Sequence, residues 1–223
     1  QFVPDGPEVP VFTYRDISQP AGSGTVPGPT VVVKYRQPAV LRCYNLLTED
    51  RDKPEWGEQP NDTFHAHETS IHLHGGHNTA HGDGYPDFYT LAGEARDYWY
   101  TNCGPQRTVN GVAPVHGEDF DLAWIPTTLW YHDHAMDVTG FNVAKGLAGF
   151  YLIQDDHEVE MTKLKNGKRK LPKFYGHQDI PMALMDQVID LKQEILPYDF
   201  FDHNGRIGNV FSVNGKLQPY HKV

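Results

Sequence analysis

The sequence predicts an all-β fold, a sandwich or barrel of short strands joined by tight turns. The 223 residues include 21 Gly and 17 Pro, and aromatic residues make up 12% of the chain. This composition favours many short strands over a long helical bundle or a coiled coil. Apolar and β-branched runs recur along the whole chain with almost no helical periodicity, which also argues against disorder.

Strands are expected where β-branched and aromatic residues are bounded by Gly, Pro or charged residues. The run Thr30–Tyr35 is typical, because it is rich in valine and lies between Pro29 and Pro38. One short helix is expected within residues 136–145. The predicted strands cover residues 10–17, 30–35, 40–47, 70–74, 98–100, 127–131, 147–153 and 179–185, and a further turn and strand begin within 210–220.

The chain is expected to divide into three segments. Residues 1–157 form a first β domain. Residues 158–173 form an exposed basic hairpin centred on Asn166-Gly167, a type I′ turn pattern, which serves as a connector; the alternative is a polyanion site. Residues 174–223 begin a second β domain. Because about 50 residues are marginal for an independent β sandwich, we expect this second domain to be completed by residues outside the chain.

Charge and cysteine content restrict the partners and the location. There are 19 Lys and Arg against 29 Asp and Glu, a net charge of −10, which disfavours binding to nucleic acid or to an anionic membrane surface. No apolar run is long enough for a transmembrane helix.

The N-glycosylation pattern at Asn61 and a start at Gln1 without Met favour a secreted, extracellular or periplasmic protein. Cys43 and Cys103 form either one disulfide or two buried free thiols.

Two closely spaced histidine pairs predict a metal site. The chain has 13 His and only 2 Cys, so zinc ribbons and iron–sulfur clusters are excluded. His72 and His74 lie in a predicted strand, where a spacing of two places both rings on one face. His132 and His134 repeat this spacing after a second strand. Four imidazoles from neighbouring strands suit copper, zinc, iron or nickel; the alternative is that they only occupy polar strand positions.

The histidine pairs stand in longer motifs that resemble a known family. The segments Ser70–Gly76, Asp83–Pro86 and Leu129–Met136 resemble the first two copper-binding motifs of multicopper oxidases, in the branch of spore-coat laccase, bilirubin oxidase and phenoxazinone synthase. Residues 27–30 are similar to a strand start in the first domain of that family. Residues 179–181 and 213–216 resemble the start of its second domain.

The resemblance implies a cupredoxin-like Greek-key β sandwich or barrel, followed by the start of a second, incomplete cupredoxin-like domain. It implies a type 1 copper that takes electrons from a small reducing substrate, and a trinuclear cluster that reduces dioxygen to water. By motif, His72 would bind the type 2 copper, and His74, His132 and His134 the type 3 pair. Asp83 matches an acidic residue that orients water and relays protons; its alternative role is that of a turn residue between Gly82 and Gly84.

The chain departs from the family in one large respect. It has no His-Cys-His run, and Cys43 and Cys103 stand outside any such motif, so it lacks the residues of a type 1 site. We therefore expect it to supply half of the trinuclear cluster, as the N-terminal part of a longer oxidase. A C-terminal fragment or companion chain would then be its partner.

The remaining histidines show no such pattern. His67, like His65, has the opposite strand parity to His72 and is expected to face away from the metal, whereas His77 and His81 border either the cluster or solvent. Trp130 and Met136 are expected to pack around the site. Histidines without any ligand pattern are His116, His157, His177, His203 and His221.

The leading functional hypothesis is a laccase-like oxidase of phenols or bilirubin-like pigments. Within the same family, the alternative is an oxidase of Fe(II) or Mn(II). Outside it, the alternatives are a copper-binding β domain without turnover and a zinc hydrolase, which needs an open metal position and a general base.

Overall fold

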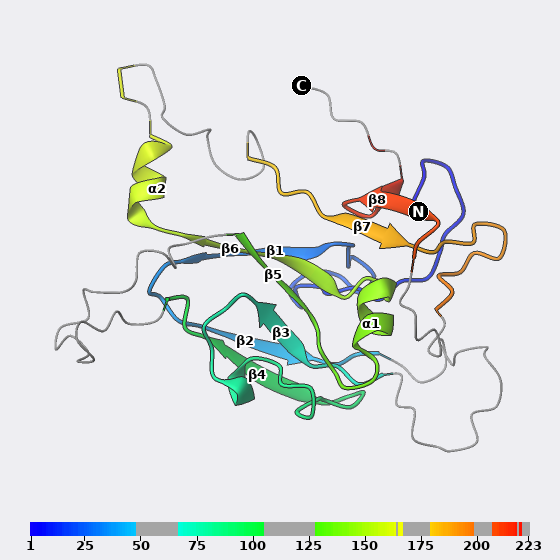
Figure 1. The fold of residues 1–223 in the computed structure, drawn as a ribbon, viewed down its shortest axis with the longest axis horizontal. Helices are drawn as coiled ribbons and strands as arrows, with labels where there is room; N and C mark the ends of the chain where they lie inside the picture. The colour runs from blue at the N-terminus through cyan, green and yellow to red at the C-terminus, as the bar shows by residue number, and fades with distance from the viewer. Residues whose placement is uncertain are drawn as a thin grey trace. The chain divides into compact units, whose positions relative to one another are not determined.

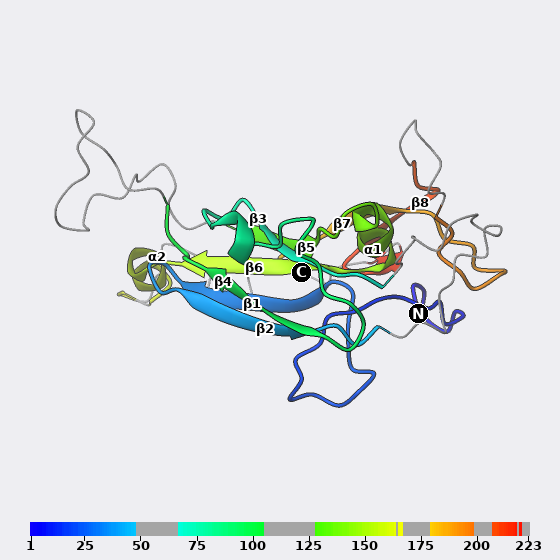
Figure 2. The same cartoon turned by 90° about the horizontal axis from the view of Figure 1, so that it is seen from below.

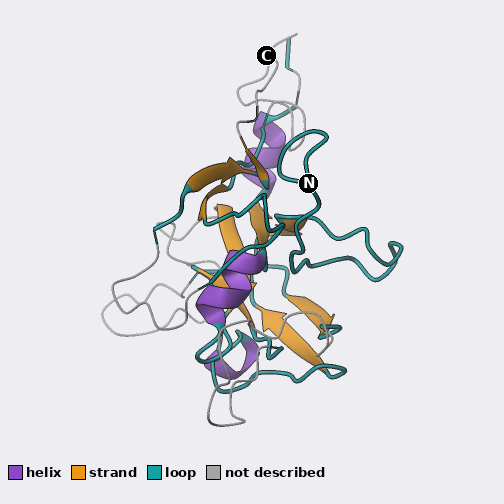
Figure 3. Ribbon diagram, turned by 90° about the vertical axis from the view of Figure 1, so that its right-hand side faces the viewer, coloured by secondary structure: helices purple, strands orange, loops and turns teal. Residues whose placement is uncertain are grey.

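Strands predominate in the computed structural model, which describes residues 1–47, 67–104, 128–163, 165–166, 179–198, 207–217 and 219 (Figures 1 and 3). Every helix in these ranges is short. In chain order the elements are β1 (Gly28–Lys34), β2 (Ala39–Tyr44), β3 (Ile71–His74), the 3-10 helix η1 (Ala80–Gly82), β4 (Ala95–Tyr100), β5 (Thr128–Asp133), α1 (Thr139–Lys145), β6 (Ala148–Gln154), α2 (Asp156–Met161), β7 (Leu184–Gln187), β8 (Val210–Val213) and β9 (Lys216–Leu217).

The described chain forms two compact units. One contains residues 30–139 and 151–156, and the other contains residues 1–29, 140–150 and 157–223. The division predicted from the sequence, at residues 157 and 173, stays a prediction. Much of the expected connector hairpin lies outside the described residues, although Asn166 has the positive φ of 53° that a type I′ turn requires.

The unit of residues 30–139 and 151–156 is built from two layers of strands. A four-stranded sheet has the order β1-β6-β5-β3, and β2 pairs antiparallel with β4 in a separate two-stranded sheet (Figure 2). Alternation along β4 buries Tyr98 and Tyr100 and exposes Trp99. The Tyr100 ring meets Tyr151 of β6 edge to face at 5.6 Å between centroids, so these aromatic side chains fill the space between the sheets.

In the other unit, the N-terminal segment packs against the β7-β8-β9 sheet. Phe2 and Val9 share a buried apolar cluster with Ile189 and Leu196. The amide of Leu217 donates to the carbonyl of Phe2 at 2.8 Å. Residues near both ends of the chain therefore stabilise one core.

The predicted all-β class is confirmed, and most predicted strands are present with shifted ends. The strand over 10–17 is wrong: that segment forms only an isolated bridge, between Tyr14 and Thr25. Its backbone instead bonds to α1, where Phe12 donates to the carbonyl of Lys145 at 2.9 Å and its ring packs on Phe141. The strand expected over 179–185 is β7, which begins only at Leu184. The predicted helix is α1, and α2 was not expected.

Cys43 and Cys103 are both free thiols. Burial raises the pKa of Cys43, on β2, to about 11, so its thiol is protonated at neutral pH. Among the helices described, none has the length and apolar character needed to cross a bilayer. Several sequence predictions concern positions outside the described residues: Asn61, His65, His116, His177, His203 and His221.

Candidate metal centre

The pairing of β3 with β5 brings the two histidine pairs together. The strands are antiparallel, with His72 opposite His132 and His74 opposite Trp130. Residues directly opposite each other in an antiparallel pair lie on the same face of the sheet. Ile71 and Leu73 point the other way and are buried, which fixes the register and leaves the imidazoles together on the opposite face.

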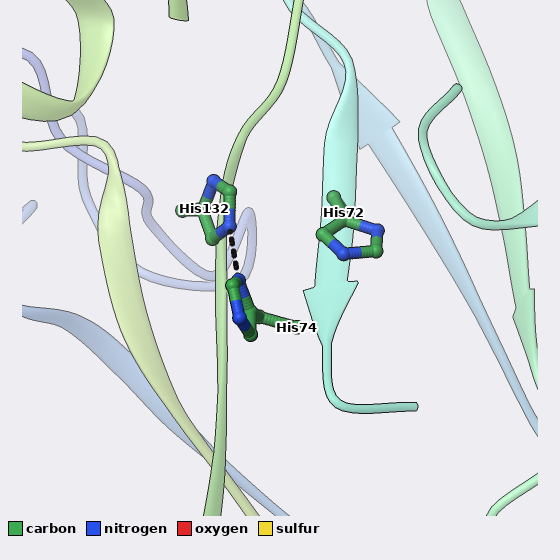
Figure 4. Close-up of side chains that lie close together, drawn as sticks. All are labelled: His72, His74 and His132. Carbon is green, nitrogen blue, oxygen red and sulfur yellow. Dashed lines mark hydrogen bonds between the residues drawn. The ribbon is translucent and has the colours of Figure 1, made fainter. Parts of the chain in front are cut away.

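The four imidazoles form one cluster. Ring centroids of His72 lie 5.7 Å from His74, 5.4 Å from His132 and 5.1 Å from His134. The rings of His132 and His134 are stacked at 5.6 Å. His72, His74 and His132 each offer a ring nitrogen, and these nitrogens lie within 4.8 Å of one another (Figure 4). Three imidazoles at such distances have the arrangement needed to hold a metal ion.

The tautomer of His132 leaves a lone pair for a ligand. Its Nδ1 donates to the carbonyl oxygen of Asp133 at 2.7 Å, and a carbonyl can only accept, so Nδ1 carries the proton. The unprotonated Nε2 accepts a hydrogen bond from Nδ1 of His74 at 3.1 Å (Figure 4, dashed line). Burial lowers the pKa of His132 to about 4, so the ring is neutral at pH 7, as a metal ligand must be.

His72 is oriented from behind by Asp83. Its Nδ1 donates to the carbonyl oxygen of Asp83 at 2.9 Å and lies 3.3 Å from the carboxylate Oδ2. The carboxylate of Asp83 raises the pKa of His72, chiefly through the hydrogen bond that it accepts from the His72 ring. With Nδ1 occupied, Nε2 of the neutral ring carries the lone pair. A carboxylate or carbonyl behind a ligating imidazole is the usual arrangement in metal sites.

The loop that carries Asp83 is itself held firmly. Oδ1 of Asp83 accepts from the amide of Leu73 at 3.1 Å and from Nδ2 of Asn78 at 3.3 Å, and the residue is 8% exposed. Gly84 has a φ of +69°, and a Cβ there would lie 2.2 Å from the carbonyl oxygen of Ile71. Only glycine permits the loop to cross β3 so closely.

His134 supplies an independent test of whether a metal fits. Its Nδ1 is buried, and among the described residues it has no hydrogen-bond partner. A buried polar nitrogen without a partner is costly, and coordination of a cation is one way to satisfy it. The orphaned nitrogen lies in the same imidazole cluster, so the residues present fit a metal with nitrogen ligands, such as copper or zinc.

Trp130 covers part of the cluster. Its indole stacks on His74 at 5.0 Å between centroids and lies 4.2 Å from the ring of His132. The expected packing role of Trp130 therefore agrees with its position. Met136, for which the same role was expected, is 45% exposed.

The other described histidines near the site stay outside the cluster. His77 and His81 are exposed, and His67 is half-buried. Asp133, a fully buried residue between the two ligand candidates His132 and His134, was not identified from the sequence. A charged residue directly between two histidines, at the end of the strand that carries Leu129 and Tyr131, was the signal that would have identified it.

Comparisons with known proteins identify relatives for nearly the whole chain. No family model matches it. The chain is 32% identical to a laccase of Bacillus stratosphericus over 98% of this chain and 40% of that protein. It is 31% identical to a bilirubin oxidase of Albifimbria verrucaria over 90% of this chain and 27% of that protein.

Solved structures agree with these relatives in fold. A laccase from Pediococcus acidilactici superimposes with a TM-score of 0.63 at 21% identity, covering 98% of this chain and 44% of that one. The expected cupredoxin-like fold is thereby confirmed. The chain spans 40% or less of the length of the two curated relatives named above.

Proposed function

We infer that this chain, a member of the multicopper oxidase family, is the N-terminal part of a laccase-like oxidase and supplies half of its oxygen-reducing copper cluster. One observation carries the proposal: two strands in register bring four imidazoles together, with three ring nitrogens within 4.8 Å of one another. Relatives named laccase and bilirubin oxidase support oxidation as the activity.

His72 would hold a type 2 copper, and His74, His132 and His134 would hold the type 3 pair. Support comes from their motif positions and from the nitrogen lone pairs that the hydrogen bonds to Asp83 and Asp133 direct away from the backbone. When bound, copper would supply the one-electron redox chemistry that oxygen reduction needs. The protein's contribution is to keep the rings neutral, oriented and close together.

Asp83 would hold and pass on protons at the edge of the cluster. Its Oδ2 lies 3.3 Å from Nδ1 of His72, and Oδ1 is occupied by two N–H donors. One carboxylate oxygen is therefore fixed by the loop, while the other faces the histidine. This division suits a group that takes up a proton without losing its position.

The remaining copper ligands would come from residues outside this chain. The sequence lacks a His-Cys-His run, so the type 1 site and the other half of the cluster would lie on a C-terminal portion or companion chain. The exposed face of the β7-β8 sheet supports such a partner, because Leu184 and Phe211 are both 75% exposed on the same side of the strands. Dioxygen and a small phenolic or pigment substrate would be the other partners.

A location outside the cytoplasm, secreted or periplasmic, is part of the same proposal. Its support is the glycosylation pattern at Asn61, which lies outside the described residues.

Metal analysis of the full protein tests the proposal. We expect bound copper, its loss by more than half in His132→Ala, and no loss in His81→Ala, which removes an exposed imidazole nearby. Elemental analysis together with oxygen uptake gives both readouts. Zinc in place of copper, or full oxygen uptake in His132→Ala, would contradict the proposed function.

A further inference from the structure

Asp133 is a fully buried carboxylate between His132 and His134. Its two oxygens accept from different parts of the chain. Oδ1 accepts from the amide of Ser70 at 2.9 Å, and Oδ2 accepts from the amide of Ala135 at 3.1 Å. The side chain therefore links the residue before β3 to the segment that follows β5.

The carboxylate continues the pairing of β3 with β5 beyond the point where the strands end. β5 ends at Asp133, which is opposite Ile71. Beyond it, the amide of His134 donates to the carbonyl of Ser70 at 2.7 Å. Both backbone groups of Ser70 are thus bound to residues 133–134, one through a side chain and one through the main chain.

These bonds restrain the backbone that carries the imidazoles. Ser70 lies two residues before His72, and the bonds of Asp133 fix the backbone on both sides of His134. The carbonyl of the same residue accepts from Nδ1 of His132 at 2.7 Å, which selects the tautomer with a lone pair on Nε2. The side chain and the main chain of Asp133 thus hold parts of both histidine pairs.

We propose that Asp133 is a positioning residue for the metal centre, which locks the two histidine pairs in the geometry that binds copper. The inference rests on the proposed function. The carboxylate of Asp133 accepts from the amides of Ser70 and Ala135, so it acts on the histidines through the backbone of residues 70 and 133–135.

The chemistry of the site requires two acceptors. In Asp133→Asn, the amide oxygen can still accept one N–H, but the NH₂ group would face the other N–H, donor against donor. A buried donor would then be unsatisfied, and the backbone would have to shift to relieve it. Asp133→Ser has one oxygen on a shorter side chain, so it also removes at least one of the two acceptors and gives a second variant.

Copper affinity and spectroscopy in the full protein test this inference. We expect Asp133→Asn to weaken Cu(II) binding by about 10- to 100-fold, the range found when a residue that orients metal ligands is removed. The Cu(II) electron paramagnetic resonance parameters should also change, and Asp133→Ser should likewise weaken binding. In the metal-free protein, nitrogen-15 resonances of the histidine rings should shift in Asp133→Asn, because the backbone that carries His132 and His134 moves.

The matched control is Tyr151→Phe. It removes a buried hydrogen bond, from Tyr151 to Oδ1 of Asn102 at 2.7 Å, in the same compact unit but at no histidine. When samples with the same folded fraction are compared, we expect the Cu(II) affinity of Tyr151→Phe to lie within twofold of the wild type. Its electron paramagnetic resonance spectrum should be unchanged.

The outcomes separate the two proposals. If both Asp133 variants bind Cu(II) within twofold of the wild type with an unchanged spectrum, the positioning role is wrong while the proposed function stands. If Tyr151→Phe weakens binding as much as Asp133→Asn, the effect is general destabilisation and the positioning role is also wrong. If the wild type binds no copper, both proposals fail.

Discussion

His72 of β3 and His132 of β5 lie directly opposite each other, and their ring centroids are 5.4 Å apart. Each ring uses Nδ1 to donate to an aspartate carbonyl, Asp83 for His72 and Asp133 for His132. The two rings therefore meet with their Nε2 atoms unprotonated.

Gly84→Ala should destabilise the protein by at least about 2 kcal/mol, because it combines a left-handed backbone with a clash against β3. The new Cβ would lie 2.2 Å from the carbonyl oxygen of Ile71 and 2.6 Å from the amide of His72. Urea unfolding gives the change in free energy. Gly93→Ala is the control, because Gly93 has a φ of +86° but no atom within 4 Å of its Cβ position, so only about 1 kcal/mol of backbone strain applies. Equal losses in the two variants would show that the close crossing at Gly84 has no energetic importance.

Asp83→Asn should lower the pKa of His72, because the hydrogen bond that the ring donates to the Asp83 carboxylate is the main cause of its elevation. NMR titration of the metal-free protein measures this shift. In the full protein, turnover should slow while copper content is retained. Asp87→Asn, in the same loop and exposed, should leave the His72 titration unchanged. If turnover and its pH dependence are unaltered in Asp83→Asn, the proton relay fails even where the pKa shift is observed.

His132 should make the metal-free protein less stable in acid. Its pKa is lowered from 6.5 to about 4 by burial, so between these values the unfolded chain binds more protons than the fold. Its contribution is complete above pH 6.5 and is lost as the pH falls toward 4, a change of at most about 3 kcal/mol. Unfolding free energies measured from pH 4 to 7 should rise less steeply in His132→Gln than in the wild type. Parallel curves would contradict the predicted burial of a neutral imidazole.

Trp130 should report on metal binding. Its ring lies 5.0 Å from His74 and 4.2 Å from His132, so Cu(II) held by these histidines should quench its fluorescence. Trp130→Phe should abolish most of the copper-dependent quenching and weaken binding by less than about tenfold, the scale of a lost aromatic pair. Trp99→Phe removes an exposed indole on β4 and should leave the quenching unchanged. If Trp99→Phe abolished the quenching, copper would be bound elsewhere.

The convergence of the histidine pairs could be predicted from the sequence because it depends on local spacing. Two residues separated by one position share a strand face, and the other face buries Ile71 and Leu73 of β3 and Leu129 and Tyr131 of β5. The parts that could not be predicted depend on contacts between distant segments. The carboxylate of Asp133 bonds to Ser70, 63 residues away, and Gly84 crosses β3 at Ile71.

The strand predicted over residues 10–17 is wrong for the same reason. The β-branched and aromatic residues of this segment favour a strand locally, but the backbone of Phe12 bonds to Lys145 and not to a neighbouring strand. A high strand propensity means that the side chains of a segment fit the surface of a sheet. It does not provide the neighbouring strand with which the segment must pair. The late start of β7 at Leu184 also reflects where its partner β8 begins and ends.

Leu184 and Phe211 are both largely exposed to water on one side of β7 and β8. This exposure affects the solubility of the protein during preparation. Two large apolar side chains exposed on a sheet favour aggregation, and a charged neighbour such as Asp186 opposes it only in part. Produced alone, the polypeptide should precipitate readily at high concentration, and polar replacement of Phe211 should be the first remedy for anyone preparing it.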